Sequence, residues 1–549
     1  MNKNKVNHKS NITGKKSVLL TASIIVQLIA LIVRIPLTRI IGDEGNGIYA
    51  AVFELYSIAL LLTVGCMPEA IAGTIALRTA RGQYKNAYRV FKIAFLWNFI
   101  AGLIVCLLLV LGADYFANTM MLIPMSAIPL RMLGPVAILM GMVVTLQGYF
   151  QGMGTIMPTS VSQIVEQVIG AVSSIIASLL LCNYGIKVAH LLHNNSFAAS
   201  YAVMGISVGT IIGVLVSFFF LLFVFGMYRQ QRKKQIDKDM AKGKESTKTI
   251  IYSLLYALIP IILITGIYPI SNLLDQLIYN RIMTDSGQAA KQVVNFGIYA
   301  GKYKVLIWIP ITVASMIWSP LIPALNAAYE RVDIRVIRNK VLTVFRLTMV
   351  IILPFSIGLI LMARPVLNTF YAGEITLACQ MLQEGSVAMT LIAYASVGNA
   401  VLLGMNKHKT VTIHNVVSLV LHIITLIIML KYMGLGIHAI VYANMIMAAM
   451  TSVLNHIALK KYMKYKIEWI RTFLIPFVGS VIMGLIASFI YKIFEKAIGN
   501  DASVILAFIF SLILYYILIV MFRSVNEKDL LGMPFGKTII KILKLAHVI

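Results

Sequence analysis

The sequence predicts an all-α polytopic membrane protein with about 14 transmembrane helices. Of its 549 residues, 59% are hydrophobic and only 12% are charged, whereas about 25% are charged in a typical soluble domain. The apolar residues form runs long enough to span a bilayer, which takes roughly 20 residues per helix. Lys and Arg lie mainly between these runs, so we interpret the formal charge of +27 as membrane topology and not as nucleic-acid binding.

Continuous apolar stretches separated by short polar breaks define the expected helices. Strands are disfavoured because the stretches are long and because lipid offers no water to satisfy an open strand edge. The expected helices cover residues 17–41, 47–77, 90–113, 123–150, 159–183, 199–227, 251–282, 296–326, 341–363, 377–404, 411–430, 435–459, 472–491 and 502–522.

The distribution of Lys and Arg predicts the orientation in the membrane. With the N-terminus in the cytoplasm, cytoplasmic segments hold 34 of the 47 Lys and Arg residues and external loops hold 6. Since cytoplasmic loops carry an excess of these residues, we predict a multi-pass protein of the bacterial cytoplasmic membrane with both termini inside. The basic N-terminus leads directly into a long apolar run, so we expect no cleavable signal peptide.

The longest internal loop predicts the domain organisation. We interpret residues 1–227 as an N-terminal six-helix bundle, 228–250 as a basic cytoplasmic linker, 251–460 as a second six-helix bundle, and 461–549 as two further helices with a basic cytoplasmic tail. A simpler interpretation of the loop is a solvated segment without a linker role.

A faint internal repeat favours two related bundles. Pro68 in LLTVGCMPEAI and Pro320 in TVASMIWSPLI lie 252 residues apart, as do Gly152 in YFQGMGTIMPT and Gly404 in VLLGMNKHKTV. Both pairs follow helices of the same predicted direction, which is typical of a parallel repeat whose axis runs along the membrane normal. A substrate path would then run between the halves.

Two sequence blocks carry a family resemblance. The run QGYFQGMGTIMPTSVSQIVEQVIG (147–170) and the segment RIPLTRIIGDEGNGIYAAVFELYSIALLLTVGCMPEAI (34–71) resemble the MOP (multidrug/oligosaccharidyl-lipid/polysaccharide) exporter superfamily. The sequence is most similar to its polysaccharide-biosynthesis branch, which includes MurJ-type lipid II flippases and SpoVB-like spore-cortex proteins. The resemblance implies a V-shaped pair of six-helix bundles, with two C-terminal helices forming a groove. It also implies an undecaprenyl-pyrophosphate-linked substrate, alternating access, and a membrane potential or ion gradient in place of a cofactor.

Ionisable residues inside the expected helices are the candidate site residues, because each costs several kcal/mol when it faces lipid. A cavity shared by these groups would be modestly cationic. The basic residues are Arg34, Arg39, Arg131, Arg281, Lys302, Lys304 and Arg346, and the acidic residues are Glu54, Glu69, Glu166, Asp275 and Glu384.

Arg34 and Arg39 on the first expected helix are predicted to bind substrate, because a guanidinium matches phosphate oxygens bidentately. They lie five residues apart, about 140° around a straight helix, and a kink at Pro36 would change their relative directions. The alternative for Arg39 is snorkelling to the interface. MurJ-type flippases use arginines on their first helix, but their further arginine on the second helix has no counterpart here.

The seventh and eighth expected helices add four candidates. Asp275 is predicted to couple an ion or to gate transport, and a structural hydrogen bond is its alternative. Arg281, Lys302 and Lys304 are predicted to help bind the substrate, although both lysines also fit interfacial snorkelling. The resemblance favours one of the two lysines, because MurJ-type proteins place a needed cation on this helix. A bend near Gly266 would make the seventh helix a plausible gate.

Two carboxylates complete the predicted site. Glu166 shares a polar helix face with Gln163 and Gln167, spaced i, i+3 and i+4, and is predicted to line the cavity. A helix–helix hydrogen bond is its alternative. Glu69, directly after Pro68, is the second candidate, and His414, Asn415 and His422 are weaker candidates for an ion or proton site.

Other function classes fit the sequence less well. There is no Walker A sequence, no HExxH and no paired carboxylates, so we predict neither ATP hydrolysis nor an enzyme. The four cysteines form no CxxC, so no metal or disulfide is expected. A drug exporter would need an acidic cavity, a membrane glycosyltransferase would need a clustered acidic or His site with a sizeable extramembrane loop, and a scaffold would not need these buried charges.

The leading hypothesis is therefore a lipid II flippase whose cationic cavity binds the pyrophosphate. The alternative is a flippase for another lipid-linked polysaccharide or a spore-cortex precursor. We expect a monomer that contacts the bilayer, its lipid-linked substrate and possible cell-wall synthesis proteins, with no nucleic-acid partner.

Overall fold

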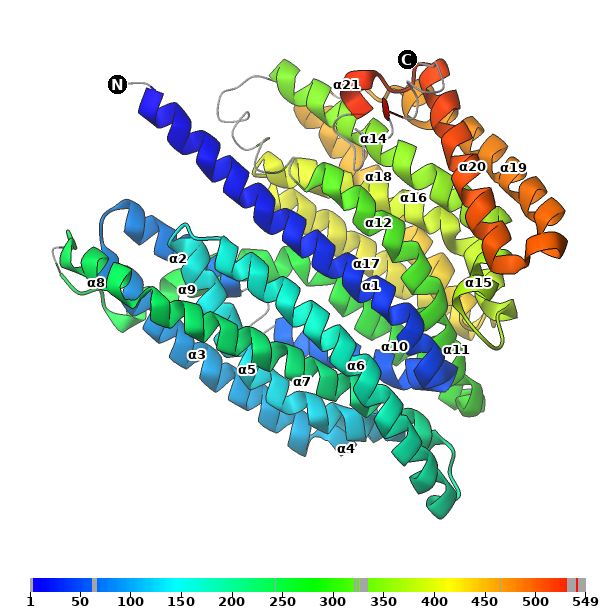
Figure 1. Cartoon of the computed structure of the whole chain (residues 1–549), viewed down its shortest axis with the longest axis horizontal. Helices are drawn as coiled ribbons and strands as arrows, with labels where there is room; N and C mark the ends of the chain where they lie inside the picture. The colour runs from blue at the N-terminus through cyan, green and yellow to red at the C-terminus, as the bar shows by residue number, and fades with distance from the viewer. Residues whose placement is uncertain are drawn as a thin grey trace. The chain divides into compact units, whose positions relative to one another are not determined.

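The computed structural model contains helices and no strands in the part of the chain that it describes, which confirms the all-α prediction. The chain forms two compact units, Met1–Gly297 and Ile298–Ile549 (Figure 1). The structure describes residues 3–61, 67–241, 243–319, 322, 325, 334–464, 466–530 and 540–541.

The first unit contains the long blue-to-green helices of Figure 1. Its helices are α1 (Lys3–Leu60), α2 (Met67–Ala80), α3 (Tyr84–Leu111), α4 (Ala113–Tyr115), η2 (Phe116–Met120), η3 (Pro124–Ser126), α5 (Ala127–Gly152), α6 (Met157–Leu192), α7 (Ser196–Met227), α8 (Arg229–Asp237), α9 (Thr247–Thr265), α10 (Ile267–Asp285) and α11 (Ala289–Ile298).

The second unit continues to the C-terminus. Its helices are η4 (Tyr299–Tyr303), α12 (Lys304–Trp318), α14 (Ile334–Leu361), α15 (Ala363–Phe370), α16 (Thr376–Gly404), α17 (His408–Lys431), α18 (His438–Met463), η5 (Ile470–Leu474), α19 (Ile475–Ile498), α20 (Asn500–Met521) and α21 (Glu527–Leu530).

Among the described residues, 12 helices are long and apolar enough to cross a membrane. The expected count of 14 is not confirmed, for two local reasons. The expected helix 17–41 and the first part of the expected helix 47–77 join as α1, which is interrupted at Gly42, where φ is 69° and ψ is −178°. Residues 67–77 lie instead on α2. The expected helix 251–282 is instead divided into α9 and α10 at Gly266, where a bend was predicted.

Large apolar side chains cover the outer faces of these helices. On α3, for example, Ile104, Leu108 and Leu111 are 52%, 57% and 78% exposed. Water would not stabilise such a continuous apolar surface, but a bilayer would, because lipid tails are as apolar as these side chains. The exposed faces therefore agree with a polytopic membrane protein.

The two units share a packing plan, which supports the predicted repeat. In the first unit α5 packs against α2, α3 and α7, and in the second unit α16 packs against α12, α14 and α18. Gly152 ends α5, where a Cβ would lie 2.7 Å from Ile75 Cβ, and Gly404 ends α16, where a Cβ would lie 2.8 Å from Leu325 Cβ. Each glycine thus permits the same kind of close helix contact, whereas Pro320 lies outside the described residues.

The basic loop of residues 228–250 is held against the ends of α2 and α3. Arg78 Nε donates to Glu245 Oε2 at 3.0 Å and to Oε1 at 3.2 Å. Asn86 donates to the Gly243 carbonyl at 3.2 Å and accepts from the Glu245 N–H at 3.2 Å. The loop is therefore bonded to the first unit and is not simply solvated. Its role as a linker between functional bundles stays a prediction.

Small residues allow α6 and α7 to pack closely along their length, as Figure 1 shows. Gly205, Gly209 and Gly213 recur every fourth residue on α7. A Cβ on Gly209 would overlap the backbone nitrogen, Cα and Oγ of Ser174 on α6. This pattern is typical of membrane helices, whose association depends on close van der Waals contact.

We predict that Gly209→Ala destabilises the protein by about 1–3 kcal/mol, because α6 and α7 must separate to admit the methyl group. The measurement is the thermal unfolding midpoint of the full chain in detergent. Gly226→Ala is the matched control, since Gly226 lies on the same helix with no atom within 4 Å of its would-be Cβ. Equal midpoints for the two variants would contradict this account.

Candidate functional site

The break in α1 creates a polar corner around Arg34. Asn46 Nδ2 donates to the carbonyl of Gly42, the residue at the break, at 2.7 Å. Asn46 Oδ1 in turn accepts from Arg34 Nη2 at 2.9 Å. The guanidinium carbon of Arg34 lies 3.6 Å from the centre of the Tyr49 ring, a cation–π contact. Arg34 is half-buried and held by residues on the far side of the break.

The same corner is packed tightly against α11. A Cβ on Gly47 would overlap the Val293 carbonyl, and a Cβ on Gly297 would overlap the Asp43 carbonyl. Since the two backbones approach this closely, neither glycine tolerates a side chain. The close contact fixes the direction of α1 after its break and thereby the position of Asn46 beneath Arg34.

α10 carries a row of buried polar side chains. Asp275, Gln276 and Asn280 are 1%, 0% and 0% exposed. Asn280 Nδ2 donates to the Met121 carbonyl at 2.7 Å, which joins α10 to the segment after η2. Asp275, a predicted coupling residue, is therefore placed inside the protein, as a charged group in a membrane helix must be. Sequence reasoning missed Gln276 and Asn280, although both share its polar stretch.

Three other predicted residues of the first unit lie on its surface. Arg39 and Glu69 are exposed. Arg281 Nε lies 3.5 Å from Asp285 Oδ2, in an i, i+4 pair whose side chains are 68% and 63% exposed. Glu166 on α6 is half-buried. The structure therefore divides the predicted residues of this unit into an inner set, with Arg34 and Asp275, and an outer set.

In the second unit, η4 carries Lys302 into the interior. Lys302 is 2% exposed, and its Nζ donates to the Glu374 carbonyl at 2.8 Å. Lys304, one residue after η4, is half-buried. The Glu374 side chain accepts from Thr376, and these hydrogen bonds, first from the hydroxyl and then from the N–H, lower the pKa of Glu374. π-Helical turns such as η4 often occur at functional sites.

A hydrogen-bonded network joins α16, α17 and α18. Asn455 Nδ2 donates to Asn399 Oδ1 at 2.9 Å, and Asn399 Nδ2 donates to Asn415 Oδ1 at 3.3 Å. His414 Nδ1 lies 2.8 Å from Asn455 Oδ1. His414 and Asn415 were weak sequence candidates, whereas Asn399 and Asn455 were missed because only the fold brings these helices together. Among the described residues, no three His, Cys, Asp or Glu side chains could hold a metal ion.

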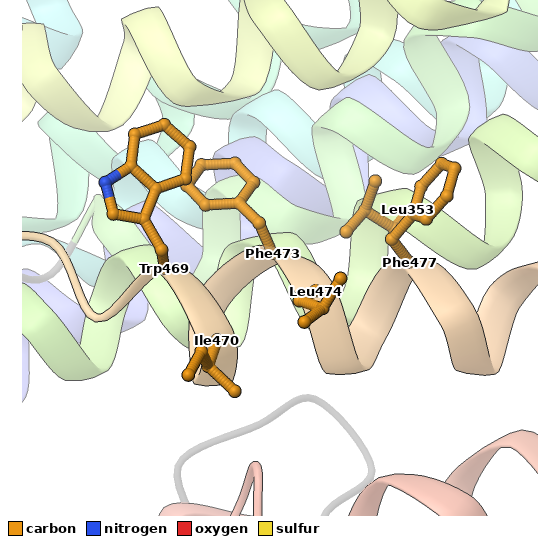
Figure 2. A pocket seen from close by; sticks show the side chains of 6 residues that line it. All are labelled: Leu353, Trp469, Ile470, Phe473, Leu474 and Phe477. Carbon is orange, nitrogen blue, oxygen red and sulfur yellow. The ribbon is translucent and has the colours of Figure 1, made fainter.

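An apolar groove of about 390 Å³ lies where α14 meets η5 and α19. Figure 2 shows the rings of Trp469, Phe473 and Phe477 along one side of the helix, with Leu353 beside Phe477. Trp469 and Phe477 are 65% and 48% exposed, so the groove is open. Its remaining lining residues are Ile470 and Leu474. The aromatic spacing of i, i+4 and i+8 was readable in the sequence, but it does not reveal what the helix packs against.

Comparison with known proteins identifies the family of this chain. The model of the family described as polysaccharide biosynthesis protein matches residues 13–329, more than half of the chain. The chain belongs to this family.

Two curated relatives come from Bacillus subtilis (strain 168). Lipid II flippase MurJ is 22% identical over 434 residues, which cover 76% of this chain and 77% of MurJ. Stage V sporulation protein B is 22% identical over 529 residues, which cover 95% of this chain and 98% of that protein. The polysaccharide-biosynthesis branch expected from the sequence is thereby confirmed.

Solved structures show the same fold. The inward closed conformation of lipid II flippase MurJ matches with a TM-score of 0.63 and 13% identity, over 91% of this chain and 98% of that chain. An inward-facing MATE family transporter of the MOP superfamily matches with a TM-score of 0.58 and 15% identity, over 80% of this chain and 96% of that chain. The family member described here therefore shares the fold of these MOP superfamily transporters.

We predict that Lys302→Ala destabilises the second unit by on the order of 2 kcal/mol. The change empties buried volume and leaves the Glu374 carbonyl without its Lys302 donor. Thermal unfolding in detergent measures this effect. Lys304→Ala is the control, because Lys304 is half-buried, and we expect it to lower the midpoint less. A larger loss for Lys304→Ala would reverse our assignment of Lys302 as the structural lysine.

Proposed function

We propose that this family member flips a lipid-linked anionic sugar precursor across the bacterial cytoplasmic membrane, and that lipid II is its substrate. The observation that carries the proposal is the open apolar groove beside η5 and α19, two elements that follow the paired bundles. A groove lined by exposed aromatic and aliphatic side chains suits a polyprenyl tail, because burying apolar surface is favourable by about 25 cal/mol per Å².

The similarity to a flippase supports the same proposal. The MurJ structure matches 91% of this chain, whereas the MATE transporter matches 80%. The part of this chain that the MATE transporter does not match is long enough for helices in addition to the shared bundles. In our proposal the groove lies on these additional helices. A drug exporter would leave the groove without an evident role.

The cationic part of the substrate site in this proposal centres on Arg34. Its guanidinium is half-buried, oriented by Asn46 and stacked on Tyr49. A positioned guanidinium donates two parallel hydrogen bonds to phosphate oxygens, which Lys provides only as a point charge. In the second unit Lys302 already donates to the Glu374 carbonyl, and a role for Lys304 in binding the substrate stays a prediction.

We propose alternating access as the mechanism, with the helix breaks at Gly42 and Gly266 as its bending points. Helices bend where the regular hydrogen-bond ladder is interrupted. An inside-negative membrane potential supplies about 2.3 kcal/mol per charge per 100 mV. This energy favours outward movement of an anionic head group, or inward return of a net-cationic empty carrier, so no ATP site is needed.

A second candidate substrate is another lipid-linked precursor, such as one used in spore-cortex synthesis. The observation that favours it is the alignment with stage V sporulation protein B, which extends over 95% of this chain, against 76% for MurJ. Both candidates share a polyprenyl pyrophosphate carrier and would use the same groove and arginine.

The test is complementation in a bacterium depleted of its lipid II flippase, scored by growth and by externally labelled lipid II. We expect the wild-type chain to restore both readouts. Arg34→Ala should reduce labelled lipid II at least tenfold, since losing charge-assisted hydrogen bonds costs about 1.5–3 kcal/mol. Arg34→Lys should retain partial activity, because it keeps the charge but not the bidentate geometry.

Arg131→Ala at equal expression is the matched control. Arg131 is paired with Asp114 at the surface, with 45% of its side chain exposed, and has no place in the site. Full activity of Arg34→Ala would remove Arg34 from the site and leave the transport proposal standing. Failure of a well-expressed wild type would reject lipid II and direct the same assay to sporulation mutants.

A further inference from the structure

A half-buried arginine lies on the same helix face as the groove. Arg346 precedes the groove residue Leu353 by seven residues on α14, which is two helical turns and about 10 Å. On the opposite wall, Glu468 directly precedes the groove residue Trp469. Arg346 and Glu468 also contact each other, so they meet at the Trp469 end of the groove.

Two carboxylates hold the Arg346 guanidinium. Arg346 Nη2 lies 2.9 Å from Asp529 Oδ2, and Nη1 lies 3.5 Å from Glu468 Oε2. The Arg346 side chain is 12% exposed, and its Nε has no hydrogen-bond partner among the described residues. Because this Nε is buried, the guanidinium gains a further anionic oxygen only when its carboxylate partners move.

The second carboxylate, Asp529, comes from the segment that follows α20, residues 524–530. Ser524 Oγ donates to the Arg471 carbonyl at 2.7 Å, which seats this segment against η5. Ser524 and Val525 are 1% and 2% exposed, so the seat is buried. The segment thereby delivers Asp529 to Arg346 from outside the groove, and movement of the segment would release the guanidinium.

The charges around this end of the groove favour an anion. Lys464, Lys466 and Arg471 are exposed on the segment that leads into η5. They lie close in sequence to the groove residues Trp469 and Ile470. Together with Arg346 they outnumber Glu468 and Asp529, and such an excess of positive charge concentrates anionic ligands. Glu468 is 41% exposed and bonded at 3.5 Å, which is a weak pair that an incoming phosphate can replace.

We propose that Arg346 binds the phosphate of a polyprenyl-phosphate lipid whose tail occupies the groove, and that Asp529 and Glu468 occupy the guanidinium until the lipid arrives. This inference rests on the proposed function, because it takes the same class of substrate. It adds a head-group contact at the groove itself, with residues 524–530 as a latch over it.

The experiment measures binding to the purified full chain in detergent. The probes are a polyprenyl pyrophosphate, the polyprenyl alcohol of equal length, and inorganic pyrophosphate. We expect the wild type to bind the lipid pyrophosphate about tenfold more tightly than the alcohol, and free pyrophosphate weakly. Arg346→Gln should abolish the preference for the pyrophosphate while leaving alcohol binding unchanged. A merely structural arginine would alter binding of both lipids equally.

Two further variants keep the inference testable if Arg346→Gln does not fold. Asp529→Asn removes a competing carboxylate and should tighten binding of the lipid pyrophosphate severalfold without affecting the alcohol. Trp469→Ala should weaken both lipids, because it removes part of the groove. Lys496→Gln, at the opposite end of α19 from η5, is the charge-matched control and should change neither.

Equal binding of the two lipids by the wild type, or unchanged discrimination in both Arg346→Gln and Asp529→Asn, would overturn the inference. Tight binding of free pyrophosphate with no gain from the tail would also overturn it, because the groove would then take no part. These results are separable from the complementation assay. If the wild type transports lipid II but its lipid binding does not depend on Arg346, this inference alone is rejected. If lipid binding depends on Arg346 but the chain transports neither precursor in the complementation assays, the transport proposal alone is rejected.

Discussion

Every backbone polar group inside a membrane must find a partner within the protein, and this constraint organises the whole chain. It makes the structure helical, and it also governs the exceptions. Where α1 breaks at Gly42, the Asn46 side chain donates a further hydrogen bond to the Gly42 carbonyl. That same amide then accepts from Arg34. The position of the principal candidate residue thus depends on hydrogen bonds that join the two sides of the helix break.

In both units, the inward-placed basic side chains contact specific polar or aromatic partners. Arg34 has an amide and an aromatic ring, Lys302 has a backbone carbonyl, and Arg346 has two carboxylates. These arrangements differ in whether the basic side chain can still donate hydrogen bonds to a ligand. A lysine that donates to a carbonyl is best explained as structural, whereas a guanidinium offers five donors and can exchange partners. The arginines are therefore better suited than Lys302 to meet a phosphate.

Helices pack closely through small residues in some parts of the structure, whereas the helices around the groove leave apolar side chains uncovered. Gly209 and Ser174 bring α6 and α7 into backbone contact, and Gly152 and Gly404 do so at equivalent helix ends in each unit. Rigid helix pairs of this kind can move as bodies. In the groove beside α19 no helix packs over the aromatic side chains among the described residues, since Trp469 and Phe477 remain largely exposed. An apolar surface of that shape has lipid as its natural occupant.

The sequence by itself determined the fold class, the approximate helix limits and the family, because apolar run length, bulky outward residues and two family-specific blocks are all local signals. It also singled out Arg34 and Asp275, which are half-buried and buried in the structure, and their roles stay predictions. It could not decide the helix count. α1 continues through residues 42–46, where a polar gap was expected, whereas the apolar run 251–282 is divided at Gly266. The partners of each charge belong to tertiary structure. Arg281 pairs at the surface with Asp285, Lys302 donates to the Glu374 carbonyl, and Arg346 meets residues more than a hundred positions away. Helical spacing predicts which face a side chain occupies, but only packing decides what that face meets.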